Sequence, residues 1–254
     1  MKIVTLKNTY FIADAHLGSW AIKDTRDKEK HLVRFLDSIK DDAHALYMLG
    51  DMFDFWHEYR YTVPRGYTRF LGKLSELTDK GVEVHFLIGN HDLWMHDYLR
   101  QECGVTIHME KLLPITIGSK QFCLAHGDGL DRKDWKYLLL RGMFHNKVCQ
   151  CLFASIHPRW AMKLGYVWAR HSRLKHDGQE GILLPEEKDH TLAFARQYAA
   201  DNPQTDYFLI GHRHVDQVCD LPNGGLFIVL GDWISKFTYA KFDGNNLTVN
   251  HFNR

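Results

Sequence analysis

Five short segments of this 254-residue chain combine carboxylate, amide and imidazole side chains, the groups that bind divalent metals in proteins. They are Asp14-Ala15-His16, Gly50-Asp51-Met52-Phe53-Asp54, Gly89-Asn90-His91-Asp92, His126-Gly127-Asp128 and Gly211-His212-Arg213-His214. The expected ligands are the oxygens of Asp14, Asp51 and Asn90 and the nitrogens of His16, His126, His212 and His214. Mixed ligands suit Mn²⁺, Fe²⁺ or Zn²⁺ better than Ca²⁺. Seven are too many for one octahedral ion that also holds water, which predicts two ions sharing a carboxylate.

Each segment follows an apolar run that predicts a buried strand, at 9–13, 45–49, 82–88, 121–125 and 207–210. Helical patterns at 25–40 and 67–79 separate the first three strands, which favours parallel strands joined by right-handed crossovers. Since sites form at the carboxyl ends of such strands, the five segments should converge. A lone Asp-x-His is more often a surface turn, so the prediction depends on the ordered set.

After residue 105 the pattern becomes strand-rich. A hairpin is expected at 113–117 and 121–125, and further strands at 217–219, 226–230, 237–242 and 247–252. Together with the alternating first half, these strands predict an α/β fold.

The overall composition is that of a globular protein, with 45% hydrophobic and 25% charged residues, which excludes disordered, collagen-like and coiled-coil classes. A net charge of +1 argues against a chain that is basic over its whole surface. The 17 histidines favour a metal enzyme, because imidazole is the commonest biological metal ligand.

The cellular compartment is indicated by the absence of a disulfide pattern, a secretory signal and a membrane span from the sequence. Its five cysteines have no paired spacing, which favours a reducing environment over a disulfide framework. No secretory signal precedes Asp14, and no apolar run approaches the ~18 residues of a membrane span. A cytoplasmic location is expected.

Residues 131–185 differ from the rest of the chain. From Arg132 to Lys175, ten Lys or Arg face one acid, Asp134, so this segment carries +9 and the remainder −8. It also holds seven aromatic residues, and a helix starting at Pro158 would align Trp160, Leu164, Val167, Trp168 and His171 on one face. We expect a basic, aromatic helical cap inserted in a single domain spanning 1–254. The simpler interpretation is an amphipathic helix pair packed on the core.

Taken in order, the five segments resemble the calcineurin-like metallophosphoesterases, whose pattern is D-x-H, GD-x-x-D, GNH-D/E, H-G and GH-x-H. The resemblance spans nearly the whole chain apart from the insertion. It implies a four-layer α/β/β/α sandwich with two metals at the strand ends. One metal would be bound by Asp14, His16, Asp51 and His214; the other by Asp51, Asn90, His126 and His212, with Asp51 bridging.

The resemblance also implies a mechanism. Two divalent ions ~3.5–4 Å apart lower the pKa of a bridging water, and the resulting hydroxide attacks phosphorus in line with the leaving oxygen. His91 matches the family's catalytic histidine and would stabilise developing charge or protonate the leaving group. Asp92 would orient His91 through a hydrogen bond.

Three stretches narrow the resemblance to the UDP-2,3-diacylglucosamine hydrolases of lipid A synthesis. They are 50–56, 126–128 and Val229-Leu230-Gly231-Asp232-Trp233. That family places its substrate-covering helices after His-Gly-Asp, where this chain has its insertion. The resemblance implies Mn²⁺-dependent cleavage of a pyrophosphate, giving UMP and 2,3-diacylglucosamine 1-phosphate.

Such a nucleotide-linked glycolipid needs cations beside an apolar slot and an enzyme resting peripherally on the anionic inner-membrane surface. By position, Asp134 and Tyr137 match residues near the family's substrate pocket, and Asn90 would face the substrate as well as a metal. Arg170, Arg173 and Lys175 are candidate phosphate or sugar contacts, or else ordinary solvated helix charge.

Two features depart from that hydrolase family. Its best-known members carry Arg where this chain has His91, and the cap sequence matches only loosely. A related lipid or nucleotide pyrophosphatase with another substrate therefore stays open.

Two further alternatives remain. The first is a phosphodiesterase or nuclease whose insertion grips nucleic acid, with salt-sensitive binding and stacking aromatics. The amphipathic pattern of 160–171 weighs against nucleic acid, since it favours an apolar groove. The second is a scaffold built on a degenerate fold of the same family, which is disfavoured because all seven ligand positions are filled. No obligate protein partner is evident.

Overall fold

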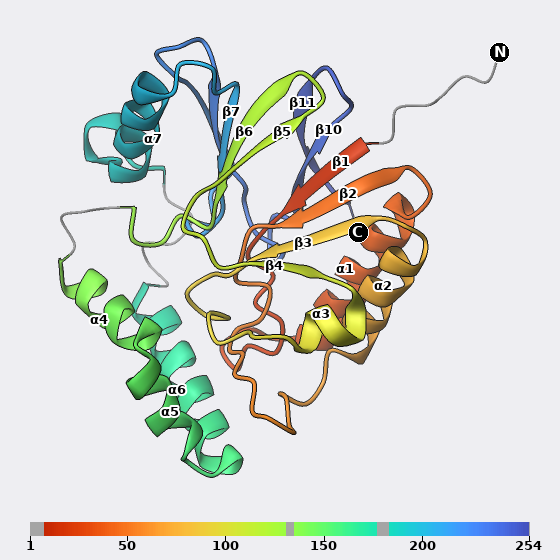
Figure 1. The fold of residues 1–254 in the computed structure, drawn as a ribbon, viewed down its shortest axis with the longest axis vertical. Coiled ribbons are helices and arrows are strands. Elements are labelled where there is room, and N and C mark those ends of the chain that lie inside the picture. The colour runs from red at the N-terminus through yellow and green to blue at the C-terminus, as the bar shows by residue number, and fades with distance from the viewer. Residues whose placement is uncertain (1–7, 131–134, 177–182, 254) are drawn as a thin grey trace.

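Two β-sheets lie face to face at the centre of the computed structural model, which describes residues 8–130, 135–176 and 183–253, and only the backbone of 136 and 172–176 (Figure 1). The first sheet has the order β11-β10-β1-β2-β3-β4. Its strands are β1 (Asn8–Ile12), β2 (Ala43–Met48), β3 (Glu83–Leu87), β4 (Thr106–His108), β10 (Thr238–Phe242) and β11 (Leu247–His251). Strands β1 to β3 are parallel, as expected, β4 adds a fourth parallel strand that was not expected, and β10 and β11 extend the sheet antiparallel.

The second sheet has the order β5-β6-β7-β9-β8. Its strands are β5 (Leu113–Ile117), β6 (Lys120–Ala125), β7 (Tyr207–Ile210), β8 (Gln217–Asp220) and β9 (Leu226–Val229). Strands β6, β7 and β9 are parallel, and β5 forms the expected hairpin with β6. The two sheets pack through buried aromatics, with the ring of Phe11 stacked on that of Phe122 at 5.6 Å between centroids.

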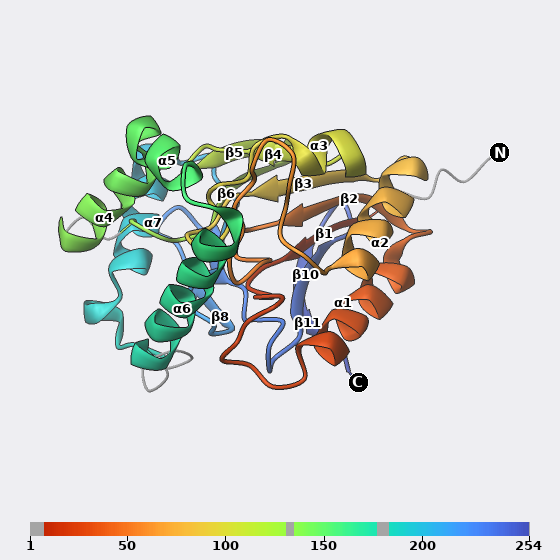
Figure 2. The same cartoon turned by 90° about the horizontal axis from the view of Figure 1, so that it is seen from below.

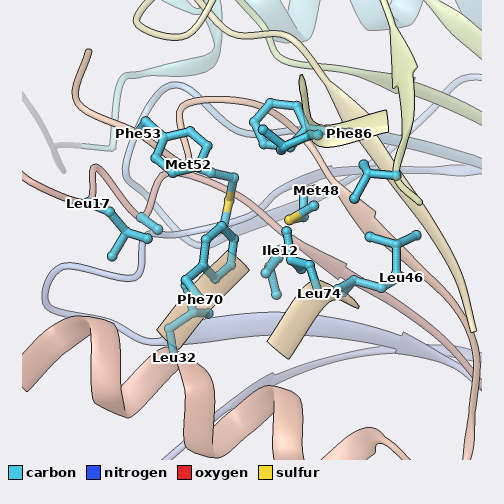
Figure 3. Close-up of a cluster of buried hydrophobic side chains, with 14 of the residues drawn as sticks. Ile12, Leu17, Leu32, Leu46, Met48, Met52, Phe53, Phe70, Leu74 and Phe86 are labelled. Carbon is cyan, nitrogen blue, oxygen red and sulfur yellow. The ribbon is translucent and has the colours of Figure 1, made fainter. Parts of the chain in front are cut away.

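Helices cover the outer face of each sheet. On the first sheet lie α1 (Thr25–Ile39), α2 (Thr68–Asp79) and α3 (Tyr98–Cys103); on the second lies α7 (His190–Asp201). Figure 3 shows Leu32, Phe70 and Leu74 of the helices against Ile12 and Met48 of the strands. Because both faces of β1 and β2 are buried, these strands read as continuous apolar runs. The expected four-layer α/β/β/α sandwich is confirmed.

Three helices, α4 (Trp135–His145), α5 (Lys147–Ala154) and α6 (Pro158–His176), lie together beside the sandwich (Figures 1 and 2). The strands β1 to β3 point their carboxyl ends toward this side of the molecule. Within the described parts of the chain, no helix is long and apolar enough to cross a membrane.

The α6 helix begins at Pro158, as expected, and presents two different faces. Trp160, Leu164 and Val167 are 55%, 54% and 49% exposed, whereas Ala161 and Ala169 are fully buried. The predicted apolar stripe therefore exists but lies toward solvent, and a stripe of small residues packs on the sandwich. The simpler interpretation, an amphipathic helix pair packed on the core, is therefore confirmed only in part: Phe144, Phe153 and Tyr166 pack against the core, whereas Trp160, Leu164 and Val167 do not.

Gly165 lets α6 approach the sandwich closely. A Cβ atom built on it would lie 2.3 Å from the ring of Phe55, a distance that real side chains do not reach. We expect Gly165→Ala to displace α6 and lower kcat/KM, with little loss of the sandwich itself, as measured by kinetics and thermal unfolding. The matched control is Gly142→Ala in α4, where a Cβ meets nothing within 4 Å and should stabilise the helix by about 0.5–1 kcal/mol. Equal kinetics for the two variants would contradict this packing role.

A histidine pair at the edge of the first sheet should make stability depend on pH. The Nδ1 of His85 lies 3.1 Å from the Nε2 of His108, with Tyr47 stacked on His85 and Glu83 and Glu110 within 4 Å of the outer nitrogens. Burial lowers the pKa of both imidazoles, and for His85 the neighbouring His108 adds to the effect. The folded pair therefore disfavours protonation.

Below about pH 6.5, the ordinary histidine pKa, the unfolded chain takes up protons that the folded pair resists. The free energy of unfolding should therefore fall as the pH is lowered from 7 to 5. Urea titrations at several pH values across this range should show that the free energy of unfolding depends less on pH in a His85→Gln/His108→Gln variant than in the parent protein. Parallel curves would mean that the pair does not contribute.

Candidate metal centre

The predicted ligands sit where parallel strands end. Asp14 follows β1, Asp51 follows β2, Asn90 follows β3, His126 follows β6 and His212 follows β7. Main-chain hydrogen bonds connect the loops. The amide of Asp14 donates to the carbonyl of Gly50 at 3.1 Å, and the amide of Gly211 donates to the carbonyl of His126 at 2.9 Å. The two sheets thus bring all five segments to one edge of the sandwich, as the sequence predicts.

Five of the expected ligands have left-handed backbone conformations that non-glycine residues rarely adopt. They are Asp14, His16, Asp51, His212 and His214, with φ between 43° and 69°. Such conformations persist only where surrounding contacts hold them, and they concentrate at functional sites.

The expected ligands form two clusters, and a third group brings His91 together with His16 and Asp51. Asp14, His16 and His214 offer ligand atoms within 4.8 Å of one another, and so do Asp51, His126 and His212. Asp51 connects the clusters, since its Oδ2 lies 3.6 Å from the Nε2 of His16 and 3.4 Å from the Nε2 of His126. Its position fits a carboxylate shared by two ions. The Oδ1 of Asn90 lies 3.1 Å from the Nε2 of His126, beside the second cluster.

Burial and unmet hydrogen bonding fit a cation better than a purely structural cluster. Asp14 is fully buried, and its Oδ1 has no hydrogen-bond partner among the described residues. The Nε2 atoms of His16 and His214 each lie 3.7 Å from this oxygen. A buried carboxylate oxygen among imidazole nitrogens is a donor set that a divalent ion satisfies.

Outer contacts orient three of the imidazoles. The Nδ1 of His126 lies 2.8 Å from the carbonyl oxygen of Leu49, that of His16 lies 3.4 Å from Asp54, and that of His214 lies 3.6 Å from Asp232. The His126 contact is a hydrogen bond and the other two are within ion-pair distance, and all three place Nδ1 outward and Nε2 toward the cluster, the usual arrangement around metal-binding histidines. The role of Asp232 was missed from the sequence, although it too follows an apolar strand, β9.

Protonation equilibria differ between the two central carboxylates. Burial raises the pKa of Asp14 to about 6, against the opposing influence of His214 and His126. Burial also disfavours ionised Asp51, but the imidazoles of His126, His91 and His16 outweigh it and hold its pKa well below the usual value. Asp51 therefore stays charged, as a shared ligand must.

His91 lies beside the clusters, its ring perpendicular to that of His16 with 4.9 Å between centroids. The prediction that the Asp92 carboxylate accepts a hydrogen bond from His91 was wrong. The Nδ1 of His91 lies 2.7 Å from the main-chain carbonyl oxygen of Asp54, while Asp92 accepts from the amides of Gly89 and Met52 at 2.7 and 2.9 Å. Both carboxylate oxygens of fully buried Asp92 accept hydrogen bonds from main-chain amides. Asp92 therefore connects the loops that carry the ligands and does not orient His91.

The predicted substrate contacts are only partly described. The hydroxyl of Tyr137 donates to the carboxylate of Asp128 at 3.0 Å, and the Nε of Arg141, which sequence reasoning missed, donates to the same oxygen at 2.6 Å. These bonds tie α4 to the loop of His126. Arg170 is exposed on α6. Asp134 and the side chains of Arg173 and Lys175 lie outside the described residues.

Comparison with known proteins agrees with this geometry. A family model described as calcineurin-like phosphoesterase matches residues 7–216. A UDP-2,3-diacylglucosamine hydrolase from Porphyromonas gingivalis is 39% identical over 251 residues, covering 94% of this chain and 95% of the relative. Hydrolases of the same name from Neisseria meningitidis and Neisseria gonorrhoeae are 31% and 32% identical, each covering 94% of this chain and 96% of the relative.

Proposed function

The chain belongs to the calcineurin-like phosphoesterase family, and on that premise we propose that it hydrolyses the pyrophosphate of UDP-2,3-diacylglucosamine. The products are UMP and 2,3-diacylglucosamine 1-phosphate, an intermediate of lipid A synthesis. The observation that carries the proposal is the pair of clusters joined by Asp51. Beside them lies helix α6, whose exposed apolar stripe is flanked by cationic side chains. Near full-length similarity to hydrolases of this name supports the choice of substrate.

Two divalent ions, for which Mn²⁺ is our proposal, would supply a bound water of lowered pKa and neutralise charge on the phosphoryl oxygens. Asp14, His16, Asp51 and His214 would hold one ion, and Asp51, Asn90, His126 and His212 the other. The contacts of Asp54, Asp232 and the Leu49 carbonyl orient the imidazoles for this task.

We infer that His91 acts on the leaving oxygen. Its Nδ1 is engaged by the carbonyl of Asp54 at 2.7 Å, so Nε2 is the nitrogen that can meet a phosphoryl group. A protonated imidazole there stabilises developing charge or gives its proton to the leaving phosphate. Asp92 supports this arrangement by holding the loop at Gly89.

We further propose that residues 131–185 are a cap on a single domain spanning 1–254 and that the cap binds the acyl chains. The ring of Trp168 lies 6.4 Å from that of His91, so the exposed stripe of α6 begins beside the site. Leu164 and Trp160 continue the stripe away from it. Acyl chains leaving the reaction centre would meet apolar surface in this direction.

We also propose that α6 binds peripherally to the inner-membrane surface. Arg159, Lys163 and Arg170 are exposed on α6 next to the apolar stripe. Apolar side chains flanked by cations suit an anionic lipid surface, each basic residue near it contributing about 1 kcal/mol.

The proposal is tested by comparing four substrates in the presence of Mn²⁺: UDP-2,3-diacylglucosamine, UDP-N-acetylglucosamine, a cyclic nucleotide and single-stranded DNA. We expect selective release of UMP from the acylated substrate. Equal rates on the unacylated sugar nucleotide would contradict the role of the apolar stripe. Preference for DNA, with binding that weakens steeply as salt rises, would favour a nuclease instead.

A further inference from the structure

Two of the metal-ligand candidates, His212 and His214, flank Arg213 in one short loop after β7. His214 belongs to the first cluster and His212 to the second. Both have left-handed backbone angles, with φ of 69° at His212 and 53° at His214. The position of this one loop therefore affects both clusters, and strain at both ligands must be held by neighbouring contacts.

The side chain of Arg213 is anchored away from the clusters. Its Nη1 forms an ion pair with Oδ2 of Asp189 and lies 3.3 Å from the hydroxyl of Thr191. The Asp189 carboxyl is 1% exposed and the Arg213 side chain 11%. The pair is thus shielded from water, where losing one partner of a charge pair has a large effect.

The other carboxylate oxygen of Asp189 caps helix α7. Its Oδ1 accepts from the amides of Thr191 and Leu192 at 3.1 and 3.0 Å and from the Thr191 hydroxyl at 2.6 Å. One carboxylate thus connects the first turn of α7 to the loop that carries two ligands. Asp189 is the residue directly before α7, the first α-helix after α6 in the chain.

We propose that the Asp189–Arg213 ion pair is a positioning device that sets the affinity of both metal sites by holding His212 and His214 in place. The proposal rests on the two-ion assignment made above but not on the identity of the substrate. Neither residue is a catalytic group, because each would act only through the positions of His212 and His214.

The informative variant is Asp189→Asn, since asparagine caps a helix about as well as aspartate but carries no charge for Arg213. We expect the metal-free protein to bind Mn²⁺ about 10–100-fold more weakly, the range found when supporting partners of metal ligands are removed. Binding is measured by calorimetric titration with Mn²⁺ alone, and helix content by circular dichroism. Arg213→Gln should have a similar effect, and the double variant should bind no more weakly than either single one.

The matched control is Glu186→Gln, which removes an ion pair between Glu186 and Arg196 of α7, with 2.7 Å between nitrogen and oxygen. This pair is far more exposed to solvent than the pair of Asp189 and Arg213. The control variant should leave Mn²⁺ affinity unchanged. Wild-type affinity in Asp189→Asn, with or without a lower melting temperature, would overturn the proposal and leave the pair a structural contact. A parent protein that binds two Mn²⁺ yet releases no UMP would contradict the proposed function alone, because the titration needs no substrate.

Discussion

Asp51→Asn is expected to lower kcat by about 10³-fold or more and to reduce the number of Mn²⁺ ions bound per chain. Asp51 lies within 3.6 Å of imidazoles from both clusters and is held ionised by them. A neutral amide cannot neutralise two cations, and several kcal/mol of transition-state stabilisation depend on such a centre, at 1.36 kcal/mol for each factor of ten. Turnover and metal content should be measured on the same preparation.

The fold should survive this change. The Oδ1 of Asp51 accepts a hydrogen bond from the amide of His91 at 2.8 Å, and an asparagine carbonyl can accept the same bond. Asp206→Asn is the control. Asp206 directly precedes β7, at the end of this strand opposite to the candidate metal centre, and it pairs with Lys120 at 2.7 Å. The control variant should keep full activity. Near-normal turnover with two ions bound in Asp51→Asn would show that the centre has another shared ligand.

His91→Ala is expected to lower kcat by about 10²-fold while both metals stay bound, because general acid–base catalysis by a positioned side chain contributes about 10²–10⁴-fold. The imidazole also lies within reach of Asp51 and His16, so it could alternatively be a ligand. Metal content separates these roles. A catalytic residue leaves the content unchanged, whereas a ligand lowers it.

His44→Ala, on an exposed position of β2, controls for general effects of removing a histidine and should behave as the parent protein does. Unchanged turnover in fully metallated His91→Ala would remove His91 from the mechanism. Rescue of the variant by added imidazole would support a proton-transfer role.

Much of the fold follows from local patterns. The observed strand and helix limits for β1, α1, β2, α2 and β3 lie within two residues of those predicted, because fully buried parallel strands are continuous apolar runs. Helix α7 and the short α3 and β4 were missed. Helix α7 buries Ala195 and Ala199, small residues that give little amphipathic contrast.

The orientation of α6 was decided by tertiary packing. Its strongest apolar stripe, which includes Trp160 and Leu164, would be placed inside by periodicity alone. The opposite stripe of Ala161, Gly165 and Ala169 is buried instead, since only small side chains let the helix approach Phe55. The large apolar residues are thereby left exposed, where a lipid substrate could use them.

The sequence by itself determined which candidate ligands converge, because each follows a strand and the carboxyl ends of parallel strands meet on one side of a sheet. Only the tertiary structure decided what holds them. His91 is oriented by the carbonyl of Asp54 rather than by Asp92, and the ligand loop is anchored by Asp189 through Arg213. These contacts join residues 37 and 24 positions apart, and such pairings depend on how the loops pack, which no local pattern encodes.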